Sequence, residues 1–248
     1  MISVIMPTYN EVGNIAALID RTARTLKKNF EIIVVDDNSP DGTSQLVEKL
    51  QPTRPYLRLI TRVSERGLPS AVERGIKEAR GRIVSWFDCD LSVAPENLAR
   101  FRPLIKKYDL VLGSTFIDGG ADIRGHLPAR FFSSVINKLA QLILTPQITD
   151  YTSGLIMARK TALAGTRFDG THGAYFIGLL YRAYKHRLKI IEVPYQFGRR
   201  GYGVSKISGP WSYFKASLVY LRTLLLTRFF VSSLLYLFPL LTAWHSVC

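Results

Sequence analysis

Cysteine and histidine are scarce in this sequence, which argues against a metal-bound or disulfide-linked fold. Its 248 residues include two cysteines, Cys89 and Cys248, and four histidines without metal-ligand spacing. These numbers exclude a disulfide framework and a four-ligand zinc site. No G-x-G-x-x-G segment follows the first predicted strand, which disfavours a dinucleotide-binding domain. The N-terminus lacks a basic segment and a cleavage site, so it predicts a first buried strand rather than a signal peptide.

Acidic residues are outnumbered, with 19 Asp and Glu against 33 Lys and Arg and a formal net charge of +14. This excess suits a nucleic acid, an anionic membrane surface or a phosphorylated substrate, and charge alone does not choose among them. Hydrophobic residues make up 47% of the chain, which excludes a disordered protein. A chain of this length buries a sizeable core as one domain, with room for an appendage.

Charged side chains are absent from the 19 residues 229–247. As a helix this segment would be about 28 Å long, close to the roughly 30 Å of a bilayer's hydrocarbon core. We therefore predict one C-terminal transmembrane helix at 229–247, in a membrane protein whose domain at 1–207 stays on the cytoplasmic side, because Lys215, Arg222 and Arg228 precede the span. Residues 208–228 mix aromatics, leucine and these cations. This mixture favours amphipathic interfacial helices over a soluble core helix.

Short β-branched segments alternate with segments of helical periodicity through the first two thirds of the chain. This alternation is typical of βαβ units around a largely parallel sheet, so we expect an α/β fold. The expected strands are residues 2–6, 31–35, 57–60, 83–87, 110–112 and 189–193, and the expected helices are 14–28, 44–50, 70–80 and one from Pro95. No internal repeat or low-complexity linker divides them.

Two acidic clusters follow predicted strands. Asp36 and Asp37 come at the end of the second strand, and Asp88 and Asp90 follow the fourth. Ligands of open parallel sheets bind outside the carboxyl ends of the strands, so both clusters are expected at one crevice. Residues two apart in an extended segment face the same side, which lets Asp88 and Asp90 share one ion. Paired carboxylates suit Mg²⁺ or Mn²⁺. The alternative is that these aspartates only shape turns and cap helices.

Five motifs occur in a fixed order: I-M-P-T-Y-N-E near the N-terminus, D-D-N-S-P-D-G-T after the second strand, F-D-C-D-L-S-V-A-P-E, D-Y-T-S-G at 150–154 and R-x-x-G-x-S-K at 200–206. Together they make the chain resemble the family 2 glycosyltransferases over about residues 2–210. The S-P-D-G-T form is similar to the branch that transfers mannose from GDP-mannose to a dolichyl or polyprenyl phosphate with inversion. The resemblance implies a GT-A, Rossmann-like catalytic domain at 1–207 with a mixed, mostly parallel sheet.

The resemblance also implies roles for individual positions. It implies nucleotide contacts by Pro7, Tyr9, Glu11, Val35, Asp37, Asp88, Cys89 and Lys206. It implies a Mg²⁺ or Mn²⁺ cofactor on Asp88, Asp90 and Ser92, catalytic roles for Asp90, Asp150 and Arg200, and an acceptor-phosphate site at Arg130 and Arg200. Residue chemistry agrees in part, because Tyr9 can stack on a base and Glu11 can accept hydrogen bonds from it. The glycine-containing segment 199–206 is expected to act as a lid over the phosphates.

Four positions depart from the family pattern. Ser92 stands where an acid or amide is common, Thr115 where Arg is usual, Gly178 where an acid is often found and Arg199 where Asp is frequent. Three alternatives stay open: a glucosyl or other transferase that uses a UDP-sugar, a catalytically weak membrane-bound homologue, and a basic RNA-binding module. No nucleic-acid partner is expected, because aromatics do not cluster between cations in the first 200 residues. Protein partners stay unknown at this point.

Overall fold

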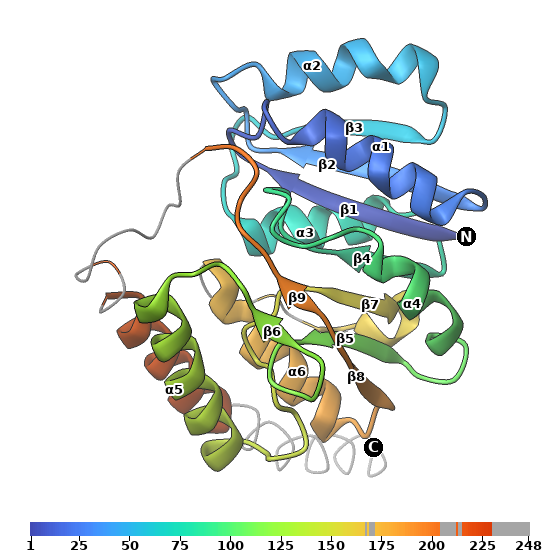
Figure 1. The fold of residues 1–248 in the computed structure, drawn as a ribbon. Coiled ribbons are helices and arrows are strands. Elements are labelled where there is room, and N and C mark those ends of the chain that lie inside the picture. Colours follow the sequence, from blue (N-terminus) through green and yellow to red (C-terminus); the bar gives the residue numbers. More distant parts are fainter. Residues whose placement is uncertain (167, 169–171, 204–211, 213–214, 230–248) are drawn as a thin grey trace, which may run out of the picture.

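A computed structural model describes residues 1–166, 168, 172–203, 212 and 215–229. Within them, seven strands form one mixed sheet in the order β3-β2-β1-β4-β7-β5-β8 (Figure 1). The strands are β1 (Ile2–Thr8), β2 (Phe30–Asp36), β3 (Leu57–Thr61), β4 (Ile83–Trp86), β5 (Leu110–Ser114), β7 (Ile156–Arg159) and β8 (Ile190–Pro194). Neighbours are parallel except for β7, which runs antiparallel to β4 and β5. A second parallel pair joins β6 (Ala121–Asp122) to β9 (Gln196–Phe197).

Helices cover both faces of the large sheet. One hydrophobic cluster joins the sheet to α1 (Ile15–Leu26), α2 (Thr43–Leu50) and α4 (Asn97–Leu104), and a second joins it to α3 (Leu68–Glu78), α5 (Leu127–Ile143) and α6 (Tyr175–Lys185). Short 3₁₀ helices are η1 (Gln51–Thr53), η2 (Lys160–Leu163) and η3 (His172–Ala174). Side chains of β1 alternate between the clusters: Val4 and Met6 enter the first and Ile5 the second. The middle of β1, Val4–Met6, and the middle of β2, Ile32–Val35, are continuously apolar because both of their faces are buried.

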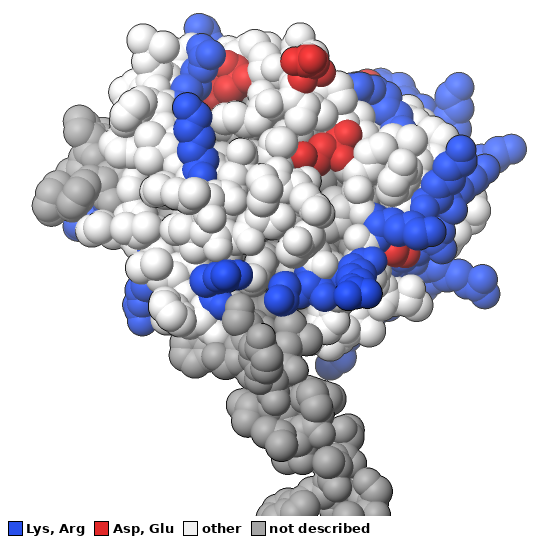
Figure 2. Space-filling view, turned by 90° about the horizontal axis from the view of Figure 1, so that it is seen from below, with Lys and Arg blue, Asp and Glu red and all other residues white. Residues whose placement is uncertain are grey.

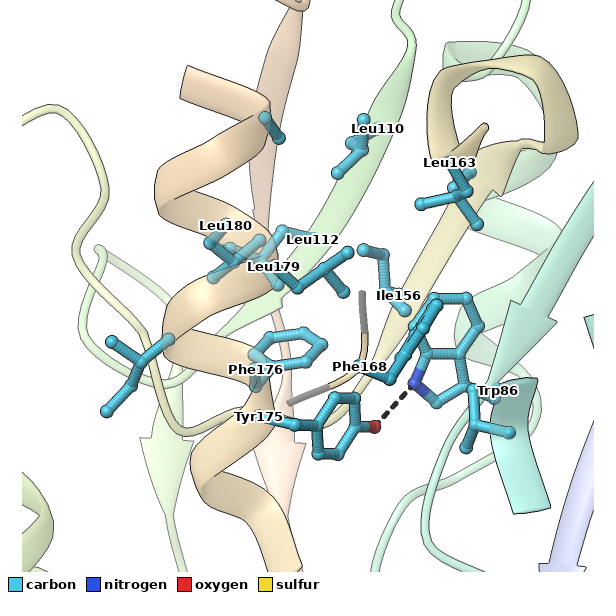
Figure 3. Packing of buried hydrophobic residues seen from close by; sticks show 14 of the residues in the cluster. Trp86, Leu110, Leu112, Ile156, Leu163, Phe168, Tyr175, Phe176, Leu179 and Leu180 are labelled. Carbon is cyan, nitrogen blue, oxygen red and sulfur yellow. Dashed lines mark hydrogen bonds between the residues drawn. The ribbon is translucent and has the colours of Figure 1, made fainter. Parts of the chain in front are cut away.

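Trp86, the last residue of β4, anchors the end of that strand to α6. Its indole Nε1 donates a 2.8 Å hydrogen bond to the Tyr175 hydroxyl, and Phe168 packs edge-on against its ring with 5.9 Å between centroids (Figure 3). Leaving the buried indole N–H without a partner would cost about 1–3 kcal/mol. This contact therefore helps to fix the end of β4, after which the chain continues into Asp88 and Asp90.

The expected α/β class with a mostly parallel sheet is confirmed. Each expected element is present, with its ends shifted by at most two residues. The helix expected at 70–80 begins earlier, at Leu68, because Pro69 suits the first turn, where an amide N–H has no helical partner. Five strands and α-helices lie outside the expected set, namely β6, α5, β7, α6 and β9, as do the three 3₁₀ helices.

Residues 215–229 are helical and pack one face against α6. Leu224 is fully buried, and Arg228 Nη1 donates a 2.9 Å hydrogen bond to the Tyr181 hydroxyl. Part of the segment expected to be interfacial, including residues 208–211, lies outside the described residues, as does the expected domain limit at 207. No helix in the described part of the chain is long and apolar enough to span a membrane. The predicted span at 229–247 lies outside the described residues, apart from Phe229.

Basic side chains dominate the face of the molecule seen in Figure 2. Lys and Arg gather toward its right-hand side, whereas Asp and Glu form a few small groups. This distribution agrees with the net charge of +14. Such a surface attracts anionic partners over distances longer than those of individual contacts.

Candidate functional site

The carboxyl ends of β1, β2 and β4 lie at one edge of the sheet, and hydrogen bonds join the loops that follow β1 and β2. The N–H group of Asn10 donates to Ser39 Oγ at 2.9 Å, and the N–H group of Glu11 donates to Thr43 Oγ1 at 3.0 Å. The Glu11 side chain therefore starts from a fixed backbone. Tyr9, just before it, lies beside a cation, with the Arg66 guanidinium 5.7 Å from its ring centroid.

Asp36 has a structural role. It is fully buried, and its carboxylate accepts hydrogen bonds of 2.6–2.8 Å from the hydroxyls of Thr8, Ser39 and Ser44. These bonds tie the end of β1 to the turn after β2. Asp36 is also not among the described residues that line the cavity considered below, so we assign it no ligand contact.

Asp37 is paired with a cation to which the sequence did not point. Arg62 Nε donates to Asp37 Oδ1 at 2.7 Å, Arg62 Nη2 contacts the same oxygen, and the Gly67 N–H donates to Oδ2 at 2.8 Å. Arg62 is only 5% exposed and also reaches Ser70 Oγ at 2.8 Å. The loop after β3 thus orients the carboxylate predicted for the nucleotide. Val35, predicted with it, is a fully buried core residue.

Asp88, Cys89 and Asp90 lie side by side in the chain but in different surroundings. Cys89 is 4% exposed and packs in the cluster of α1 and α4, so its thiol is a core group rather than a ligand of the crevice. Asp88 lines the cavity described below. Burial, followed by the charge of Asp90, raises the pKa of Asp88 to about 7. The negative charge of Asp90 thus favours the protonated form of Asp88.

The Arg200 guanidinium lies between two carboxylates. Its Nη1 donates to Glu11 Oε1 at 3.1 Å, and its Nη2 lies 2.9 Å from Asp90 Oδ2. The other Asp90 oxygen accepts hydrogen bonds from the Ser92 amide, at 2.9 Å, and from the Ser92 hydroxyl. Burial raises the pKa of Glu11, although bonds from Asn14 and Arg200 act against it. The structure thus brings together Glu11, Asp90, Ser92 and Arg200, as predicted.

Residues 199–203 of the expected lid lie against the Asp90 segment. The Gly201 N–H donates a 2.8 Å hydrogen bond to the Asp90 carbonyl. A Cβ atom on Gly201 would lie 2.8 Å from Leu91 Cδ1, so another residue at this position would force the end of the Leu91 side chain to shift. Leu91 itself has a φ of +67°, which costs a residue of this size of order 1–3 kcal/mol. Lys206, the second predicted cation of the lid, lies outside the described residues.

The acidic residues around Asp90 fit a divalent cation that has two protein ligands. Among the described residues, no group of three or more His, Cys, Asp or Glu side chains is placed to hold an ion. Asp88 and Asp90 would leave the remaining positions to water and phosphate oxygens, as is usual for Mg²⁺. Asn14 Oδ1 is a buried acceptor with no hydrogen-bond partner among the described residues. This excess of acceptors and negative charge favours a cation, and here Arg200 supplies it.

A cavity of about 280 Å³ borders Asp88 and extends among α5, α6 and residues 215–229. Much of its wall is aromatic, formed by Trp86, Phe87, Phe132, Tyr175, Phe176, Tyr195, Phe197 and Tyr220. Its polar lining includes Asp88, Thr115, Asp122, Arg124, Asp150 and Thr152. Polar groups beside an apolar wall suit a ligand with a charged head and an apolar body.

Asp150 lies in this wall, 1% exposed, with both carboxylate oxygens engaged. Oδ2 accepts from the Thr115 amide at 2.9 Å and hydroxyl at 3.0 Å, and Oδ1 accepts from the Thr152 amide at 3.0 Å and hydroxyl at 3.1 Å. Burial raises the pKa of Asp150, and these four donors act against the rise. Thr115, which departs from the family pattern, is thus a direct partner of the predicted acidic residue.

Arg124 is a cation of the cavity that the sequence analysis missed. It donates to Asp122 at 2.9 Å and lies over the Phe197 ring, 4.4 Å from the centroid. This placement depends on the pairing of β6 with β9, which joins distant segments and leaves no local signal. Arg130, the predicted acceptor residue, is exposed on the first turn of α5, next to Ala129, which lines the cavity.

The other two departures, Gly178 and Arg199, are not among the described residues that line the cavity. A Cβ on Gly178 would lie 3.7 Å from Thr227 Oγ1, so this position faces the helix at 215–229. Arg199 Nε donates to the Arg124 carbonyl at 3.2 Å and braces the turn after β6.

Comparison with known proteins agrees with the motifs. The chain is 36% identical over 216 residues to a dolichol-phosphate mannosyltransferase of Pyrococcus furiosus, covering 84% of this chain and 59% of that protein. It is 32% identical over 214 residues to a polyprenol monophosphomannose synthase of Mycolicibacterium smegmatis, covering 83% and 80%. The match thus spans under two thirds of the Pyrococcus protein.

Solved structures share the fold. A crystal structure of glucosyl-3-phosphoglycerate synthase from Mycobacterium tuberculosis, in complex with Mn²⁺, UDP and glucosyl-3-phosphoglycerate, superposes with a TM-score of 0.67 at 23% identity, covering 92% of this chain and 79% of that one. The fold is thus the expected GT-A, Rossmann-like α/β fold. The model of glycosyl transferase family 2 matches residues 3–166, more than half of the sequence, and the chain therefore belongs to glycosyl transferase family 2.

Proposed function

We propose that the chain transfers mannose from GDP-mannose to a dolichyl or polyprenyl phosphate, with inversion at the sugar carbon. The observation that carries the proposal is its identity of 32–36%, over 83–84% of its length, with relatives named dolichol-phosphate mannosyltransferase or polyprenol monophosphomannose synthase. The site supports it, because the acidic segment 88–90 adjoins, through Asp88, a cavity lined by polar and aromatic side chains.

The loops after β1, β2 and β4 bind the nucleotide part of the donor. Tyr9 stacks on the base, and Glu11 and Asp37 accept hydrogen bonds from the nucleoside. Asp88 and Asp90 would hold a Mg²⁺ or Mn²⁺ ion, which would supply positive charge for the leaving diphosphate. Arg200 would exchange its present carboxylate partners for the phosphates, which a guanidinium also binds in a bidentate way.

The acceptor needs no strong base. A lipid phosphate is mostly dianionic at neutral pH, because its second pKa is about 6. It can therefore attack the sugar directly once it is aligned, and alignment with charge neutralisation supplies most of the rate enhancement. Arg124 lies in the cavity wall and Arg130 on the adjoining turn, so both are placed to attract this phosphate.

A membrane surface would deliver the acceptor. α5 exposes a stripe of large apolar side chains, Leu127, Phe131, Val135 and Leu142, and the helix at 215–229 exposes Leu218, Val219, Leu225, Leu226 and Phe229. Both helices also border the cavity. We propose that these faces lie on the cytoplasmic surface of a bilayer, with the predicted helix at 229–247 as the anchor.

The test is product identification by mass spectrometry. Purified protein with Mn²⁺ is offered GDP-mannose, UDP-glucose and other nucleotide sugars, together with a short polyprenyl phosphate or the matching alcohol. We expect a mannosyl product from the phosphate and none from the alcohol, which lacks the ionised oxygen. Arg124→Ala and Arg130→Ala should raise the KM for the lipid phosphate more than that for the donor. Use of a UDP-sugar alone, or equal use of alcohol and phosphate, would refute the proposal.

A further inference from the structure

Asp150 lies on a turn that two other elements hold in place. Glu192, in β8, accepts three hydrogen bonds from this turn: from the Thr149 N–H at 3.0 Å, the Thr149 hydroxyl at 2.9 Å and the Asp150 N–H at 3.0 Å. On the other side, Asn137 of α5 accepts the N–H of the residue after Asp150 at 2.6 Å and donates to Thr152 Oγ1 at 2.8 Å. One carboxylate and one amide therefore fix the backbone on both sides of Asp150.

We propose that Glu192 is a positioning residue for Asp150, an inference that rests on the proposed function. Glu192 is not among the cavity's described lining residues, so it acts on a ligand only through the turn. Two consecutive N–H groups, of Thr149 and Asp150, point at its carboxylate. This arrangement restrains the peptide from which the Asp150 side chain projects toward the sugar. Charge-assisted bonds of this kind are about twice as strong as neutral ones.

A mainly structural role for Glu192 makes different predictions. Loss of a purely structural tie would lower stability and affect all ligands alike. Loss of a positioning contact would weaken binding of the group that Asp150 contacts. It would leave nucleotide binding unchanged, because the loops after β1, β2 and β4 hold the nucleotide. Misplacement of a reacting group by about 1 Å can cost 10²-fold in rate. Separate measurements on the nucleotide and the sugar therefore distinguish the two roles.

Two substitutions weaken the tie, and two serve as controls. Glu192→Gln keeps the shape but turns an NH₂ group toward one of the N–H donors. Thr149→Val removes only the hydroxyl, which bonds Glu192 and also lies 2.9 Å from Ser114 Oγ, and Thr149→Ser restores it. Glu96→Gln is the same chemical change at a side chain that is 56% exposed and pairs with Arg21, not with the Asp150 turn.

Calorimetry measures the affinities for GDP and for GDP-mannose. A transfer assay with the lipid phosphate as acceptor measures kcat and KM. We expect Glu192→Gln and Thr149→Val to bind GDP within about twofold of the unmodified chain, to lose the added affinity that the sugar provides, and to fall at least about tenfold in kcat. Thr149→Ser and Glu96→Gln should retain both.

Unchanged sugar affinity and kcat in both weakened variants would overturn the inference, as would a parallel loss of GDP binding and folding stability. If the unmodified chain binds no GDP and transfers no mannose, the proposed function fails instead, and the two failures are thus distinguishable.

Discussion

The buried pair of Arg62 and Asp37 makes a quantitative prediction for stability. Both residues are at most 6% exposed, and the Arg62 side chain also donates to Ser70 Oγ at 2.8 Å and to the Gly67 carbonyl at 3.0 Å. Arg62→Ala would leave the Asp37 carboxylate buried without its counter-ion. Breaking a buried pair from one side costs about 3–5 kcal/mol. At about 2–4 °C per kcal/mol for a chain of this size, the Tm should fall by roughly 6–20 °C.

Urea unfolding followed by tryptophan fluorescence measures this loss. Arg54→Ala is the control, because Arg54 pairs with Asp20 at 3.0 Å, with the Asp20 side chain 40% exposed, and such surface pairs contribute at most about 1 kcal/mol. The Arg62→Ala, Asp37→Asn double variant should be less destabilised than the two single losses added together. A fall of under about 1 kcal/mol for Arg62→Ala would refute the reasoning that this pair organises the loop after β3.

Three further predictions concern other parts of the molecule. Burial alone would raise the pKa of Glu31, but bonds from Ser3, the Arg80 amide and Arg58 lower it below its usual 4.5. The ionised Glu31 carboxylate therefore stabilises the fold above its unfolded-state pKa of 4.5, and this stabilisation is lost as the pH falls through its lower folded-state pKa. The difference in unfolding free energy between the unmodified chain and Glu31→Gln should accordingly shrink on acidification. Gly75→Ala places a Cβ 2.4 Å from Ile5 Cγ2 and should cost about 1–3 kcal/mol; an unchanged Tm would contradict this packing. Arg200→Ala should bind Mn²⁺ several-fold more tightly without nucleotide in calorimetry, because the ion no longer competes with a guanidinium for Asp90; equal affinity would exclude that competition.

The sequence predicted the elements whose pattern is local. β1 and β2 are short continuous apolar runs between turn signals, and α1 has one clear apolar face. α6 is hydrophobic nearly all round because it is buried, so helical periodicity fails there. α5 exposes apolar residues such as Phe131, 65% exposed, which blurs its polar face. β7 has only four residues, too few for a period to appear.

The same distinction applies to the candidate site. Asp88, Asp90 and Asp150 stand in recognisable motifs, and the structure places two of them in one cavity wall and the third against Arg200. Arg62 and Arg124 have no motif, because their places depend on contacts with Asp37, 25 residues away, and on the pairing of β6 with β9. Sequence pattern reveals groups fixed by their own strand ends, and it misses groups that only tertiary contacts bring into place.

The reversed direction of β7 divides the protein along its chain. Because β7 is antiparallel to β4 and β5, the turn that enters it, with Asp150, faces the edge at which β4 ends. Under the proposed function, residues 1–90 then hold the nucleotide and its diphosphate, and residues 110–197 hold the sugar and the acceptor phosphate, each as one uninterrupted stretch. A chimera of two relatives joined within residues 91–109 would therefore combine the nucleotide preference of one with the sugar and acceptor preferences of the other. The Arg200 segment, which bonds to Glu11 and Asp90, would have to come from the relative that supplies the nucleotide part.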